Sequence, residues 1–281
     1  MEWLTEHKIP IGQWAKAFVD WLTANAAWLF DAIAIALEHM IDAILWLLQT
    51  PHPFVIVGLA VLLAWVVRRN ATFPVFVLLA LLLVINQGYW EETTETLALV
   101  LSAAVVCMVV GVPIGVAAAH RPWLYEALRP ILDLMQTIPT FVYLIPALIL
   151  FGLGMVPGLI ATVIFAIPAP IRLTQLGISS TPRALIEAGE AFGATKRQLL
   201  WKVELPYALP NIMAGLTQTI MLSLSMVVIA ALVGADGLGV PTLRALNQVN
   251  IARGFEVGVA IVLIAIVLDR FFRKEPAGRG N

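Results

Sequence analysis

The chain has 281 residues, of which 60% are hydrophobic and only 12% are charged, whereas an ordinary soluble domain has roughly 25% charged residues. A soluble fold of this size could not cover its surface with so few charges, so the composition predicts an integral membrane protein with a lipid-facing exterior. The net charge of −1 also argues against a nucleic-acid-binding protein, which would show a basic excess.

The first 50 residues predict an amphipathic helix, for which an additional membrane span is the less favoured alternative. Acidic residues at positions 2 and 6 do not fit the positively charged start of a cleaved signal peptide. Asp31, Glu38, Asp42 and Gln49 follow one another at spacings of seven, four and seven, which places them on one helix face. We expect an extracytoplasmic tail over residues 1–50, with an amphipathic helix on the outer leaflet or packed on the bundle. A span there would hold three carboxylates near its middle.

About seven apolar segments follow this tail. A transmembrane helix needs ~20 mainly apolar residues, and segments 54–67 and 73–85 fall short of that, so we assign them to a short helical hairpin over residues 51–90. Five stronger segments define a transmembrane domain over residues 91–272, and these are 97–119, 131–153, 156–172, 211–233 and 255–271. The predicted fold is an all-α membrane protein with about seven transmembrane helices.

The positions of lysine and arginine predict the orientation. If the chain crosses seven times from the outside, 13 of its 17 cationic residues fall inside, and the acidic Glu91, Glu92 and Glu95 fall outside. The inside residues are Arg68, Arg69, Arg121, Arg129, Arg172, Arg183, Lys196, Arg197, Lys202, Arg270, Arg273, Lys274 and Arg279. Because cytoplasmic loops carry the positive excess, we predict an external N-terminus and a cytoplasmic tail over residues 273–281.

The longest predicted cytoplasmic segment covers residues 173–209. Its part from 176 to 208 carries signals for two short helices. Thr181-Pro182 predicts a helix start with proline at the first helical position, and Gly193 predicts its stop. Thr195 and Gln198 predict a capping box for the second helix, which Pro206 is expected to end. The segment is either a structural loop or a docking element for a cytoplasmic partner. A DNA-reading helix-turn-helix is discounted because the bilayer tethers both of its ends.

The same segment resembles the EAA loop of bacterial ABC importer permeases. It contains Glu187-Ala188-Gly189, three residues, Gly193, nine residues, then Val203-Glu204-Leu205-Pro206. The family pattern is Glu-Ala-Ala, three residues, Gly, nine residues, Ile, one residue, Leu-Pro, so Gly189 and Val203 depart from it. The runs 136–143, 187–206 and 218–230 are similar to the glycine betaine/proline betaine permeases and their choline-transporting relatives. The resemblance covers residues 54–272.

This resemblance implies a type I importer with a five-helix core in each of two permease copies, in the bacterial inner membrane. The substrate would be a quaternary ammonium compound, such as choline, glycine betaine or proline betaine. A cytoplasmic ATP-binding subunit would hydrolyse ATP, a periplasmic binding protein would deliver the solute, and this chain would bind no cofactor and catalyse no reaction. The ATPase-coupling loop would consist of Glu187, Ala188, Gly189, Gly193, Leu205 and Pro206, with Glu187 contacting the ATPase and Gly193 permitting the turn.

Two further regions are candidates for transport roles. Aromatic rings attract quaternary ammonium ions, so Phe141 and Tyr143 are candidates for lining the pathway, while an ordinary lipid- or core-facing position is the more common role for each. The glycine-rich segment 234–239 is predicted outside, where it is either a gate, a contact for the binding protein or a plain tight turn.

Other classes of protein fit the sequence less well. An ion-coupled secondary transporter would place ionisable groups deep in the membrane, whereas Asp133, Arg172 and Asp269 lie near predicted cytoplasmic ends. A membrane enzyme is disfavoured because His-Glu-x-x-His and Gly-x-Ser-x-Gly motifs are missing. The single cysteine and four scattered histidines predict neither a disulfide nor a metal site. An importer for another small solute, such as an amino acid, would share the same fold and loop.

Overall fold

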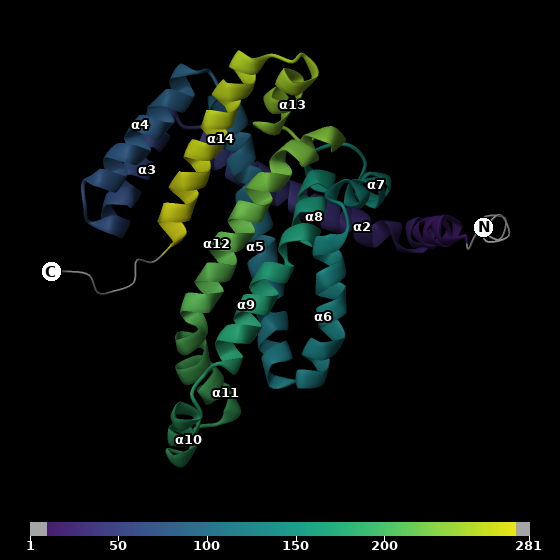
Figure 1. Cartoon of the computed structure of the whole chain (residues 1–281), viewed down its shortest axis with the longest axis vertical. Helices are drawn as coiled ribbons and strands as arrows, with labels where there is room; N and C mark the ends of the chain where they lie inside the picture. The colour runs from purple at the N-terminus through teal and green to yellow at the C-terminus, as the bar shows by residue number, and fades with distance from the viewer. Residues whose placement is uncertain (1–9, 274–281) are drawn as a thin grey trace, which may run out of the picture.

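The computed structural model describes residues 10–273, and these form helices and connecting turns without a strand. The first described helix, α2 (Ile11–Gln49), is kinked at Ala26 and meets α3 (Pro53–Arg68) at 97°. α3 and α4 (Thr72–Asn86) pack as a hairpin beside α14 (Ile251–Phe272). Figure 1 shows α2 running across the long axis that the other long helices follow. Lys274 and Arg279, together with the rest of the tail predicted after Arg273, lie outside the described residues.

Among residues 10–273, four helical segments are long and apolar enough to cross a membrane. They are α5 (Trp90–His120), the pair α8 (Met155–Ala166) and α9 (Pro168–Ser179), the segment Lys196–Val233, and α14. The third contains α11 (Lys196–Leu199), the π-helical turn η1 (Leu200–Glu204), α12 (Leu205–Ala230) and the 3-10 turn η2 (Ala231–Val233). The bent pair α2–α3, the bent pair α6–α7 and the shorter α4 complete the apolar set. The predicted all-α membrane fold is confirmed.

Segment 131–153 is not one continuous helix. α6 (Pro122–Thr137) and α7 (Thr140–Phe151) meet there at 97°. Pro139 explains the break, because a proline disfavours the helical conformation of the preceding residue, and Ile138 has an extended ψ of 131°. Together the two helices are long and apolar enough to form one broken span or a re-entrant loop. Hydropathy averages over a window and does not show the break, which one backbone angle decides.

The centre of the bundle is formed by α5, α9 and α12, which pack side by side. On α5, Gly111 and Gly115 are four residues apart, a spacing that lets membrane helices approach closely. A Cβ atom added at Gly115 would lie 2.7 Å from the carbonyl oxygen of Ile171 and 2.7 Å from Cβ of Thr174. α5 and α9 therefore meet almost backbone to backbone, and no side chain fits between them at this level.

Replacing Gly115 with valine should loosen this contact. The added side chain has to displace the α9 backbone, so we expect the unfolding free energy to fall by ~1–3 kcal/mol. Thermal unfolding of the detergent-purified protein measures the change. The control is Gly258→Val on α14, where an added Cβ would meet no atom within 4 Å. Equal shifts for the two variants would contradict the close α5–α9 contact.

Candidate functional site

The helix α10 (Arg183–Ala191) projects from one end of the bundle, and α13 (Gly239–Asn247) lies at the opposite end (Figure 1). α10 begins one residue later than predicted, because Pro182 is its N-cap, with a ψ of 132°, and not its first helical residue. Gly193 adopts a φ of +76° just after the helix, so the predicted glycine stop is present. Thr195 and Gln198 form the predicted capping box, in which the Thr195 amide donates to Oε1 of Gln198 at 2.8 Å.

An unusual feature of α10 is that none of its residues is buried. Leu185 is 46% exposed, and Phe192, which follows the helix, is 93% exposed. Glu187 and Ala188 are exposed as well. A short helix that leaves large apolar side chains without cover is suited to docking against a second protein.

Gly189 faces the other way, toward the chain itself. A Cβ atom added there would lie 2.5 Å from Cδ2 of Leu199, a buried residue at the end of α11. The departure from the Glu-Ala-Ala pattern thus has a local effect, because glycine lets α10 approach α11 more closely than alanine would. α10 is therefore seated directly on the base of the long segment Lys196–Val233.

Pro206 does not end the second helix, contrary to prediction. Helical structure continues from α11 through η1 and α12 into the membrane span, as one segment from Lys196 to Val233. Pro206 lies in the first turn of α12, directly after η1. A π-helical turn shifts the hydrogen bonds from the fourth to the fifth residue, so the helix can pass a proline that has no N–H to donate. Leu205 is partly buried and Pro206 is exposed.

The two aromatic residues proposed for the pathway lie in different surroundings on α7. Phe141 is 57% exposed, whereas Tyr143 is buried. The Tyr143 hydroxyl donates to the carbonyl oxygen of Leu134 at 3.3 Å, which connects α7 to α6. The structure therefore does not bring the two rings together on one surface.

A wide groove that the sequence did not predict lies between α12 and α14, and we call it the α12 groove. Its volume is about 1580 Å³, and along α12 its lining reaches from Pro206, at the α10 end, to Met221. Residues that line it include Pro210, Met213, Thr217, Gln218 and Met221 from α12 and Val262, Ile266 and Asp269 from α14. Gln218 was the available signal, since it is an exposed amide inside an apolar helix, and its side chain has no hydrogen-bond partner among residues 10–273.

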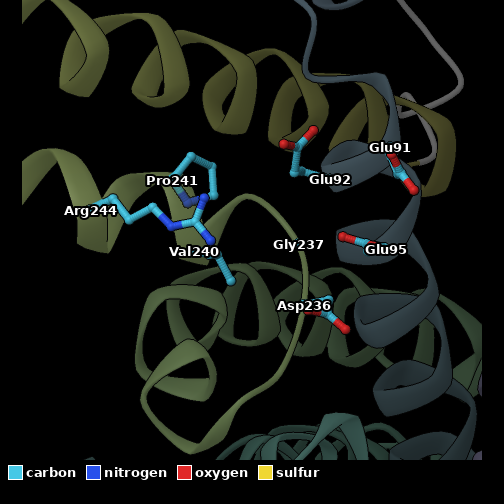
Figure 2. A pocket seen from close by; sticks show the side chains of 8 residues that line it. All are labelled: Glu91, Glu92, Glu95, Asp236, Gly237, Val240, Pro241 and Arg244. Carbon is cyan, nitrogen blue, oxygen red and sulfur yellow. The ribbon is translucent and has the colours of Figure 1, made fainter.

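At the opposite end of the bundle, the glycine-rich segment 234–239 contacts the start of α5. The amide of Leu238 donates to Oγ1 of Thr96 at 2.8 Å, and Gly237 has a φ of +121°. The adjacent hollow has a volume of about 180 Å³ and is lined by Glu91, Glu92, Glu95 and Asp236. Figure 2 shows these acidic side chains with Arg244 at one side. Within residues 10–273, no group of three or more His, Cys, Asp and Glu side chains is arranged to hold a metal ion.

Similar proteins of known function are bacterial transport permeases. The family described as "Binding-protein-dependent transport system inner membrane component" matches residues 111–273. The glycine betaine transport system permease protein OpuAB of Bacillus subtilis is 45% identical, over 98% of each chain. The glycine betaine/proline betaine permease ProW of Escherichia coli is 42% identical, over 97% of this chain and 78% of its own. The choline permease OpuBD of Bacillus subtilis is 36% identical, over 57% of this chain and 67% of its own.

A solved structure also resembles this fold. The methionine ABC transporter MetNI, in an inward-facing conformation, contains a chain that is 26% identical and matches with a TM-score of 0.57. The match covers 63% of this chain and 89% of that one.

Proposed function

Since this chain belongs to the family of binding-protein-dependent transport system inner membrane components, we propose that it is the permease subunit of an ATP-driven importer for quaternary ammonium compounds. The proposed substrate class is supported by the 45% identity to a glycine betaine permease over 98% of both chains. The permeases whose names include proline betaine and choline widen the class to compounds that share a permanently charged ammonium group. The chain forms the pathway and binds no cofactor, and ATP is used by a partner subunit.

The cytoplasmic ATP-binding subunit docks on α10. The exposed Leu185 and Phe192 supply an apolar surface, and Glu187 beside them supplies a charge that fixes orientation. Because Gly189 seats α10 on Leu199, a movement imposed on α10 reaches the long α11–α12 segment. Rigid-body movement of that segment then opens the pathway alternately to each side.

Two copies of this chain enclose the pathway between their α12 grooves. In lipid, the unpartnered Gln218 amide would cost free energy, because no water is present to satisfy it. A second copy and a water-filled pathway remove that cost. The α12 side of the groove holds two methionines and two polar side chains and no aromatic residue, which fits a passage that releases its solute, while Phe73 and Phe272 line the groove from α4 and α14. The tight site belongs to a periplasmic binding protein that docks at the α13 end.

Solute uptake tests this function directly. The chain is produced with its ATP-binding subunit and binding protein in a bacterial strain that lacks betaine and choline uptake. We expect uptake of radiolabelled glycine betaine or choline, lost on ATP depletion and absent without the binding protein. Uptake of methionine or another amino acid at a higher rate, or uptake by the purified chain alone in vesicles with an ion gradient, would overturn the proposal.

We further propose that the chain crosses the bacterial inner membrane with α2 outside and α10 in the cytoplasm. The lone cysteine, Cys107, is buried, so single cysteines can be added for labelling with little background. We expect Gln13→Cys to react with an impermeant maleimide in spheroplasts, and Lys196→Cys to react only after the membrane is ruptured. The reverse pattern would contradict the orientation.

A further inference from the structure

One contact joins the base of the coupling loop to the end of α5. His120, the last residue of α5, places Nε2 3.0 Å from Oε2 and 3.2 Å from Oε1 of Glu204. Glu204 is only 8% exposed and is the last residue of the π-helical turn η1. The two residues are 84 positions apart in the chain, so only the tertiary structure brings them together.

Both ring nitrogens of His120 face oxygen atoms. Nδ1 lies 2.9 Å from the carbonyl oxygen of Val116, which can only accept a hydrogen bond, so Nδ1 carries a proton. Nε2 faces a carboxylate, and an attractive contact there requires a second proton between the ring and Glu204. With both ring nitrogens protonated, the contact is a charge-assisted hydrogen bond, which is stronger than a bond between neutral groups.

We propose that His120 and Glu204 are positioning residues that transmit the movement of the coupling loop to α5. This inference rests on the proposed function. Glu204 lies between α11, on which α10 is seated, and α12, so the carboxylate moves with the loop. A π-helical turn is a natural place for such movement, since it is less regular than the helices on either side.

α5 extends the connection to the other side of the membrane. Its 31 residues span ~46 Å at 1.5 Å per residue, and its close contact with α9 keeps it aligned. Near its first turn, Thr96 accepts the hydrogen bond from Leu238 in the glycine-rich segment 234–239. The His120–Glu204 contact thus links the ATPase side to the segment that lies beside the acidic hollow (Figure 2).

The test uses the complete transporter in proteoliposomes, with the ATP-binding subunit and binding protein, and measures glycine betaine transported per ATP hydrolysed. We expect His120→Ala and Glu204→Ala each to lower this ratio about tenfold, within the usual range of coupling between sites. The double variant should be no worse than the poorer single variant, because both remove the same contact. His120→Arg should restore the ratio more fully than His120→Gln, because only arginine keeps the positive charge.

The neighbouring Arg121→Ala is the control, since this exposed side chain has no hydrogen-bond or ion-pair partner among residues 10–273. Additive losses, or equal rescue by His120→Arg and His120→Gln, would overturn the proposal. So would an unchanged ratio in both alanine variants. If the alanine variants do not reach the membrane, Glu204→Gln and His120→Gln give the same test, with a reduced ratio expected. Wild-type protein without ATP-dependent uptake would instead refute the proposed function itself.

Discussion

Gly193→Val is expected to abolish ATP-driven uptake while the protein still reaches the membrane. The backbone at Gly193 has a φ of +76°, and an added Cβ would meet no atom within 4 Å, so the obstacle is conformational and not steric crowding. A β-branched residue in this region costs about 1–3 kcal/mol. α10 is a nine-residue helix with no buried residue, so little packing holds it in its direction. The valine variant therefore relieves the backbone strain by changing the direction of α10. Uptake of glycine betaine and copurification of the ATP-binding subunit measure the loss.

The matched control is Gly193→Asn. Asparagine tolerates the left-handed conformation better than other side chains, because its short polar group can bond locally. We therefore expect most of the uptake to remain in this variant. If valine and asparagine behaved alike, the sharp turn at this position would not be the feature that the ATPase recognises.

Phe192→Asp should release the ATP-binding subunit without destabilising the permease. The side chain is 93% exposed, so its removal costs the fold almost nothing, whereas a buried anchor at a protein interface is worth about 2 kcal/mol or more. A carboxylate there also places an unpaired charge in the interface. We expect at least a tenfold weaker association of the two subunits in detergent, together with an unchanged thermal unfolding temperature.

The control for this prediction is Leu246→Asp on α13. Leu246 is similarly exposed, at 70%, but lies on the helix at the opposite end of the bundle (Figure 1). Its variant should retain normal association with the ATP-binding subunit. Equal weakening by both variants would show that added charge, and not the position of Phe192, causes the effect.

Local signals in the sequence predicted the turns around α10 and α11 well. The stop at Gly193 and the capping box of Thr195 and Gln198 are both present. Each depends on backbone angles and hydrogen bonds among residues close in the chain, which the residue types largely decide. The all-α membrane fold followed from composition for a related reason, since lipid requires every backbone polar group to be paired within its own helix.

Local sequence signals did not show how the structure accommodates two of its prolines. Pro139 breaks the helical path between α6 and α7, whereas Pro206 lies inside a continuous helical segment. Both prolines lack an N–H, but η1 precedes Pro206, and an extended residue precedes Pro139. Each proline removes one backbone hydrogen-bond donor from a helix, and the surrounding structure decides whether the helix breaks or continues.

The sequence by itself thus determined the membrane surroundings, the all-α class, the stop at Gly193 and the capping box at Thr195, because these depend on composition and on neighbours within a few residues. Only the tertiary structure decided that Gly189 seats α10 on Leu199, that α12 and α14 leave a groove around Gln218, and that His120 meets Glu204. Each of these contacts depends on how helices cross. That crossing is set by the summed packing of many side chains along α5, α9 and α12, which no short stretch of sequence contains.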